Sequence, residues 1–204
     1  MGNCCDGRDQ KSSKQIFIIG PPGSGKSKLT EKLSNNKKYE FIDIPELDME
    51  SSIKSREKSI ENFQKQYKKS ENDNKQIIGL ILCVKFERTD LMKRNLLSVI
   101  KFFRQFKNLM ILVVTHFDLS ENQNQDKRDL KKSLNYLLDK DEERVMFSNN
   151  FEQDGQEVID QAIQKIIEKK NELQFTLKNT IFEEFDESEQ KKLLQNMQQS
   201  FNKC

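Results

Sequence analysis

The chain has 204 residues, enough for one α/β domain with a short extension at each end. Charged residues make up 33% of the sequence and hydrophobic residues 34%, and 14 Phe with many Ile and Leu suffice for one core. Lys and Arg are interleaved with Asp and Glu at a net charge of +2, so the sequence has no basic stripe that would indicate nucleic-acid binding. No apolar run approaches the ~18 residues of a membrane-spanning helix.

Residues 1–14 are small and polar, and we predict a flexible tail. The tail begins MGNCC, which places Gly2 where N-myristoylation occurs and offers Cys4 and Cys5 for palmitoylation. Asp6 stands where that motif prefers Ser or Thr, so an unmodified tail is the alternative. Because two acyl chains give stable anchoring, the tail predicts a cytoplasmic protein held on a membrane surface by lipids.

Five near-continuous apolar runs are typical of strands that are covered on both faces of a parallel sheet. These predicted strands are 15–19, 40–44, 77–84, 110–115 and 144–147. The predicted helices are 26–34, 49–69, 90–106, 127–138 and 157–173. This alternation predicts an α/β fold with a mostly parallel sheet of about five strands over residues 15–175. Residues 176–204 are predicted to form a C-terminal helical extension that packs on the domain, binds a partner or lies on a membrane.

The segment after the first strand reads GPPGSGKS and matches the phosphate-binding loop G-x-x-x-x-G-K-[ST] between a strand and a helix. The predicted nucleotide-binding residues of this loop are Gly20, Pro21, Pro22, Gly23, Ser24, Gly25, Lys26 and Ser27. The glycines let backbone N–H groups face the phosphates, Lys26 reaches the β and γ phosphates, and the Ser27 hydroxyl ligates Mg²⁺. The loop makes the predicted fold a three-layer P-loop NTPase.

The second strand ends in FIDIPEL, and its Asp43 is a candidate to hold Mg²⁺ through water, as the Walker-B Asp does. The alternative is an Asp that ends the strand in a turn before Pro45. The spelling DIPE is similar to the D-x-P-G motif of GTPases with Glu46 in place of Gly, and Glu46 joins Lys26 as a candidate catalytic residue. Only 16 residues lie between Lys26 and Asp43, too few for a further strand and a switch I segment.

The fourth strand is followed by THFD, at the place where GTPases carry [NT]-K-x-D. A carboxylate at Asp118 would accept hydrogen bonds from guanine N1–H and N2–H₂, which adenine does not offer. Thr115 and His116 complete the motif, and the flat ring of His116 could stack on the base. A surface or capping histidine is the alternative. Ser148 and Asn149 follow the last strand, where a loop at the guanine edge would lie.

These motifs, in this order, resemble the AIG-type GTPases (the GIMAP or IAN group, related to septins and chloroplast Toc GTPases). KFERTD at residues 85–90 looks like the middle box of that family, THFD like its T-x-x-D motif, and RVMFSNN like its Asn-ended strand. The resemblance covers residues 15–173. It implies a GTP- or GDP-binding switch or scaffold that uses Mg²⁺, has weak intrinsic GTPase activity and forms a homodimer through the G domain.

Two other functions remain open. A small P-loop ATPase or nucleotide kinase would suit the spelling GPPGSGK and the short gap to Asp43, but THFD has no role in such an enzyme and no Arg-rich lid segment is visible. A degenerate interaction module would keep the fold without binding nucleotide. A comparison of GTP binding with ATP binding by the purified protein distinguishes these three functions.

Overall fold

The computed structural model describes residues 13–45, 47–49, 51–148 and 155–168. Five strands form one parallel sheet in the order β2-β1-β3-β4-β5. The strands are β1 (Lys14–Ile19), β2 (Glu40–Asp43), β3 (Gln76–Lys85), β4 (Met110–Thr115) and β5 (Val145–Phe147). The predicted α/β fold is confirmed, and each strand lies at its predicted place.

The helices follow the predicted alternation, with shifted ends. They are α1 (Lys26–Leu33), α2 (Ile53–Asn72), α3 (Thr89–Phe103), α4 (Gln123–Leu134) and α5 (Gly155–Glu168). The prediction that the second helix begins at Met49 is wrong, because the Ser52 side chain accepts a hydrogen bond from Ser55 N and caps α2 there. The predicted helices 90–106 and 127–138 run past the observed ends, since the 3₁₀ turns η1 (Arg104–Leu109) and η3 (Asn135–Leu138) follow α3 and α4. The predicted C-terminal helical extension lies outside the described residues.

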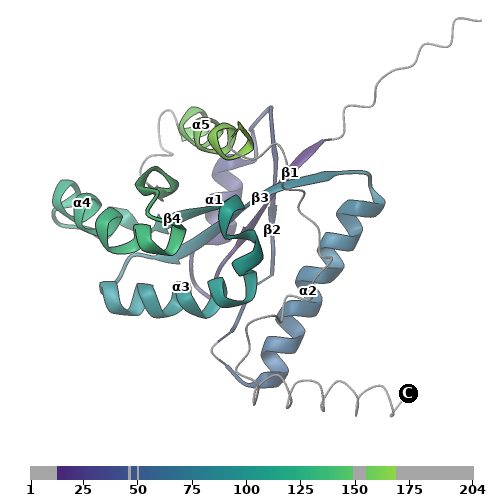
Figure 1. The fold of residues 1–204 in the computed structure, drawn as a ribbon, viewed down its shortest axis with the longest axis horizontal. Helices are drawn as coiled ribbons and strands as arrows, with labels where there is room; N and C mark the ends of the chain where they lie inside the picture. Colours follow the sequence, from purple (N-terminus) through teal and green to yellow (C-terminus); the bar gives the residue numbers. More distant parts are fainter. Residues whose placement is uncertain (1–12, 46, 50, 149–154, 169–204) are drawn as a thin grey trace, which may run out of the picture.

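Helices cover both faces of the sheet, which gives the predicted three layers. On one face, the Phe63 ring of α2 makes edge contacts with Phe17 of β1 and Phe103 of α3, at centroid distances of 5.7 and 4.8 Å. On the other face, Asn36 after α1 donates to Asp160 of α5 at 2.7 Å. Figure 1 shows α3 and α5 on opposite sides of the sheet.

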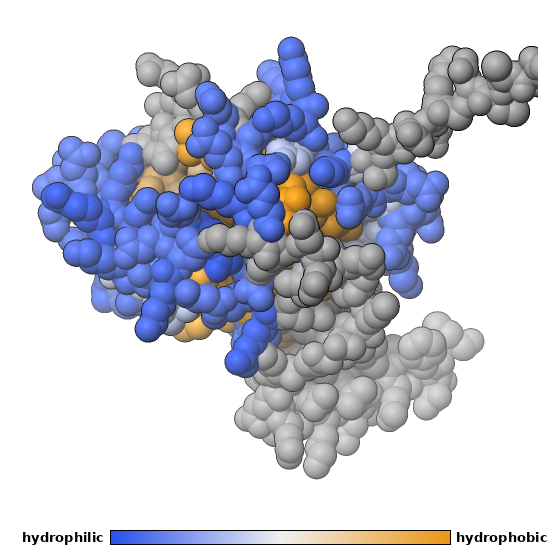
Figure 2. Space-filling view, turned by 45° about the horizontal axis from the view of Figure 1, so that its top comes forward, coloured by the Kyte–Doolittle hydropathy of each residue, from blue (hydrophilic) through white to orange (hydrophobic). Residues whose placement is uncertain are grey.

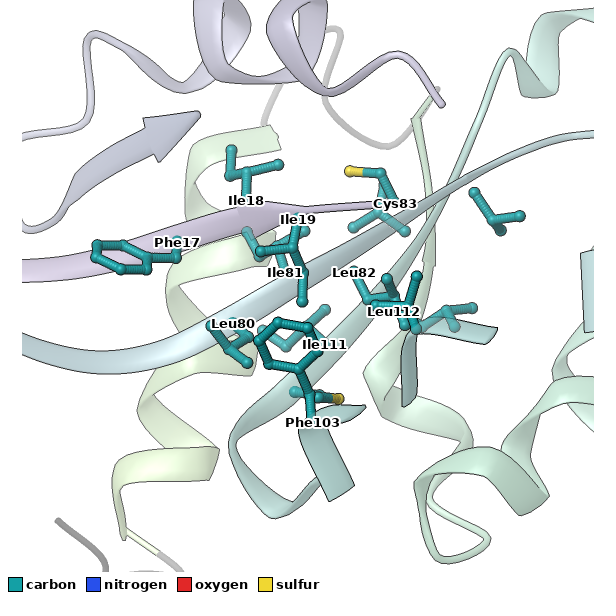
Figure 3. Packing of buried hydrophobic residues seen from close by; sticks show 14 of the residues in the cluster. Phe17, Ile18, Ile19, Leu80, Ile81, Leu82, Cys83, Phe103, Ile111 and Leu112 are labelled. Carbon is teal, nitrogen blue, oxygen red and sulfur yellow. The ribbon is translucent and has the colours of Figure 1, made fainter. Parts of the chain in front are cut away.

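The core is made by side chains of the central strands. Figure 3 shows residues of β1, β3 and β4 gathered with Phe103 of α3 in one buried cluster. Cys83 is completely buried among them, and this burial raises the pKa of its thiol to about 12. The face drawn in Figure 2 is mostly hydrophilic, with small hydrophobic patches. Within the described part of the chain, no helix has the length and apolar character needed to span a bilayer.

The order of the strands determines where a ligand binds. From β1 the chain goes to β2 on one side, then returns to β3 on the other side and continues outward to β4 and β5. Ligands of open parallel sheets bind at the carboxyl ends of the strands where the direction of winding reverses, here β1 and β3. The loops that follow β1, β3 and β4 meet at this edge.

Candidate functional site

The loop that follows β1 is pressed closely against the end of β3. A Cβ atom added to Gly20 would lie 2.5 Å from the carbonyl oxygen of Cys83, so only glycine fits there. At the other end of the loop, Gly25 has φ +75° and precedes α1 directly. Glycine adopts this left-handed conformation without the steric cost that other residues pay. The two glycines therefore let the loop turn tightly at the carboxyl edge of the sheet.

The loop and the first turn of α1 bring a positive charge and the amino end of a helix together. Lys26, the first residue of α1, is 5% exposed, and its Nζ donates to Pro21 O at 3.2 Å. The first amide groups of a helix lack intrahelical acceptors and favour anions. The Ser24 hydroxyl is buried with no hydrogen-bond partner among the described residues. This cradle is suited to a phosphate group.

Two oxygen-bearing side chains lie beside the loop, at the end of β2 and the start of α1. Ser27 Oγ donates to Asp43 Oδ2 at 2.6 Å, and both side chains are exposed. Mg²⁺ is typically held by one or two such protein oxygens together with phosphates and waters, so the pair fits this ion. The described residues contain no group of three or more His, Cys, Asp or Glu that would form an independent metal site. Glu46, the other candidate catalytic residue, lies outside the described residues.

A cavity of about 190 Å³ adjoins the loop on its other side. Its lining residues come from α1 and from the ends of β4 and β5: Gly25, Lys28, Leu29, Lys32, Thr115, His116, Asp118 and Ser148. Four of the predicted base-binding residues thus lie around one cavity next to the phosphate loop. Phe117 N donates to Ser148 Oγ at 3.3 Å, which holds the end of β5 against η2 (Phe117–Leu119). Asn149, the fifth, lies outside the described residues.

Thr115 joins this cavity to the phosphate loop. Its side chain is 4% exposed, and Oγ1 lies 2.7 Å from Ser24 O and 3.2 Å from Val84 O. The same oxygen lies 3.1 Å from His116 Nδ1. His116 has φ +51°, a left-handed conformation that turns the chain from β4 into η2. A displacement of the phosphate loop would therefore change the position of the Thr115 hydroxyl and its contact with His116.

Sequence reasoning did not include Lys28 and Lys32 of α1, which add two exposed cationic side chains to the cavity. Their spacing of four residues places them on one face of a helix, and this face lines the cavity. Helical periodicity after the phosphate loop was the signal that could have identified them.

The segment that resembles the middle box of AIG-type GTPases also reaches the site. Phe86 N donates to Thr115 O at 2.9 Å, and the Phe86 ring packs edge-on against Phe117 at a centroid distance of 5.2 Å. Phe117 in turn contacts Phe147 at 4.5 Å, and Lys127 Nζ lies over both rings. Through these three rings, η2, which begins at Phe117, packs against the residues at the ends of β3 and β5.

A larger cavity of about 420 Å³ lies between η4 (Glu142–Arg144) and α5. It includes none of the predicted site residues, and several of its charged side chains are paired with one another. Lys165 Nζ lies 2.6 Å from Glu143 Oε2, and Arg144 Nε lies 3.2 Å from Asp141 Oδ2.

Comparison with known proteins gives one match at the level of sequence families. The family model of the ATPase family associated with various cellular activities (AAA) matches residues 16–201. Among solved structures, the chain is similar to the crystal structure of a probable GTP-binding protein engB, with 17% identity and a TM-score of 0.47, over 77% of this chain and 99% of that chain. No curated protein matches. These comparisons do not show a relation to the AIG-type GTPases. Because the family model spans well over half of the chain, the protein belongs to the AAA family and is a P-loop NTPase.

Proposed function

We propose that the protein binds GTP and GDP with Mg²⁺ and works as a nucleotide-dependent switch or scaffold of AIG type. The observation that carries this proposal is the cavity beside Gly25, which is lined by Thr115, His116, Asp118 and Ser148. A phosphate cradle with an adjoining cavity has the layout that a nucleoside phosphate requires.

The choice of guanine rests on the exposed carboxylate of Asp118 in this cavity. Guanine presents N1–H and N2–H₂ as donors, and both can bond to one carboxylate. Adenine has no donor at either position, so the carboxylate would lose water without gaining a partner. Ser148, which lines the same cavity, would lie at the edge of the same base.

On the phosphate side, Lys26 would contact the β and γ phosphates, Ser27 would ligate Mg²⁺, and Asp43 would act through a water molecule. Bound there, Mg²⁺ would neutralise part of the phosphate charge. The Ser27 hydroxyl can give its lone pair to the metal and still donate its hydrogen to Asp43. The hydrogen bond between the two residues is thus compatible with metal binding.

A second candidate is ATP binding, which is favoured by the description of the matching family as ATPases. Displacement of a fluorescent GDP analogue from the purified full-length protein in Mg²⁺ distinguishes the two. We expect GTP and GDP to compete and ATP to fail. Lys26→Ala should abolish binding, and Asp118→Asn should favour xanthine nucleotides because an amide donates to the C2 carbonyl. ATP that competes as well as GTP would refute the guanine assignment.

We also propose that the protein associates with a membrane through acylation of Gly2, Cys4 and Cys5, which lie outside the described residues. The motivation is the sequence MGNCC ahead of a domain whose described helices cannot span a bilayer. Gly2→Ala should move the protein to the soluble fraction, since palmitoylation usually needs the first lipid. A wild-type protein that fractionates as soluble, with an intact mass that shows no lipid, would remove this proposal.

A further inference from the structure

The buried hydroxyl of Thr115 has three polar neighbours but only one hydrogen. Ser24 O at 2.7 Å and Val84 O at 3.2 Å are carbonyl oxygens, which only accept. Two oxygens 2.7 Å apart repel each other unless a hydrogen lies between them, so the Thr115 hydrogen points to Ser24 O. Toward its third neighbour, Thr115 Oγ1 has only lone pairs left.

That third neighbour is His116 Nδ1, at 3.1 Å from Thr115 Oγ1. A lone pair on Nδ1 would face a lone pair on the oxygen, whereas an N–H would form a hydrogen bond. The geometry therefore selects the tautomer of the neutral ring that carries its hydrogen on Nδ1. Nε2 is then a hydrogen-bond acceptor.

The ring that carries this acceptor belongs to a residue of the base cavity. His116 lines the cavity together with Asp118. Its Cε1 atom, which joins the two ring nitrogens, lies 3.0 Å from where a Cβ of Gly25 would be. The ring thus fills the space that the missing side chain of Gly25 leaves. Held by Thr115 on one side and by Gly25 on another, it has little freedom to turn.

We propose that His116 is a second base-reading residue, whose Nε2 accepts a hydrogen bond from the exocyclic N2 amine of guanine, and that Thr115 is the positioning residue that fixes its tautomer. This inference rests on the guanine site proposed above. Guanine offers three N–H donors along this edge, one on N1 and two on N2. The Asp118 carboxylate would accept hydrogen bonds from N1–H and from one N2–H. The second N2–H is left for Nε2.

The tautomer is measured without any nucleotide. His116 is the only histidine of the chain, so ¹⁵N-histidine labelling of the full-length protein gives one pair of ring signals. At a pH where those signals show a neutral ring, we expect the hydrogen on Nδ1. Thr115→Val should shift the population toward the Nε2–H form, and Thr115→Ser should restore Nδ1–H. A wild-type ring with its hydrogen on Nε2 would overturn the proposal.

The base-reading role is measured by comparing GDP with inosine diphosphate, which lacks the N2 amine, in the wild type and in His116→Phe. Phenylalanine keeps a flat aromatic ring at this position and has no acceptor. We expect His116→Phe to lose roughly three- to tenfold in GDP affinity, the value of one hydrogen bond, with inosine diphosphate affinity unchanged. An equal change for both ligands, or no change for either, would show that Nε2 does not accept from the N2 amine and would overturn the base-reading role.

The two measurements separate this inference from the proposed function. If no guanine nucleotide binds but the ring carries its hydrogen on Nδ1, the proposed function and the base-reading role fall while the positioning role of Thr115 stands. If guanine nucleotides bind and the ring is in the Nε2–H form, the proposed function stands and this inference fails.

Discussion

Two glycines of the phosphate loop provide a matched test of how the loop contacts the base cavity. Gly23 and Gly25 have nearly the same left-handed backbone, with φ of +70° and +75°. A Cβ at Gly23 would meet nothing within 4 Å, whereas a Cβ at Gly25 would lie 3.0 Å from His116 Cε1 and 3.2 Å from Thr115 Oγ1. Alanine at either position adds the same backbone strain, but only at Gly25 does it add a steric conflict.

The magnitudes follow from these contacts. Left-handed alanine costs about 1–2 kcal/mol, and the lower entropy of the unfolded chain returns about 0.4–1 kcal/mol. Both contributions cancel in the difference between the two variants. What remains is overpacking at Gly25, typically about 1–3 kcal/mol. We therefore expect Gly25→Ala to unfold at a lower urea concentration than Gly23→Ala.

Urea unfolding of the nucleotide-free protein, with EDTA present, measures this difference. The ring signals of His116 provide a local readout, and they should move in Gly25→Ala and stay in place in Gly23→Ala. Equal free energies of unfolding within about 0.5 kcal/mol, the range of ordinary surface substitutions, would refute the packing of Thr115 and His116 against Gly25.

Ser27→Ala should weaken the Mg²⁺-dependent part of GDP binding by about tenfold or more, which a Mg²⁺ titration with fluorescent GDP measures; an unchanged Mg²⁺ dependence would place the ion elsewhere. The Cys83 thiol has a pKa of about 12 when folded against an ordinary 9.0, so it stays protonated while the unfolded thiol ionises, and stability is lost as the pH rises above about 9. Urea unfolding at pH 8–10 should show a steeper loss for the wild type than for Cys83→Ala, by up to about 1.4 kcal/mol per pH unit, and parallel curves would contradict this. Single-turnover phosphate release from dilute protein with GTP should be on the order of 10⁻³ s⁻¹ or slower, and a rate of several per minute would reveal a catalytic group that is missing from the site.

The strands and the phosphate loop could be predicted because their signals are local. The strands β3 and β4 are unbroken apolar runs, and Gly20, Gly25 and Lys26 stand at fixed offsets between a strand and a helix. Asp43 could be placed beside the loop because parallel strands bring their carboxyl ends to one edge, and its 2.6 Å bond to Ser27 agrees with that expectation.

The remaining features depend on contacts between distant parts of the chain. Residues 45–52 read as polar, yet Leu47 and Met49 are buried, and Leu47 N donates to Gly20 O at 3.2 Å. This backbone bond leaves no trace in the sequence. The bond from Thr115 to Ser24 O spans 91 positions, so only the structure shows that THFD and the phosphate loop are joined.

The short connection between α1 and β2 determines which part of the protein could respond to a bound nucleotide. Residues 34–39 lie at the amino end of β2, away from Ser27, and Asn36 Oδ1 accepts from both Lys38 N and Tyr39 N. This connection therefore cannot close over a γ-phosphate. The segment after β2 instead contacts the loop, because Leu47 N donates to Gly20 O and Asp48 N donates to Ser59 Oγ of α2. The backbone of Leu47 and Asp48 thus links the phosphate loop, where the proposed nucleotide would bind, to α2.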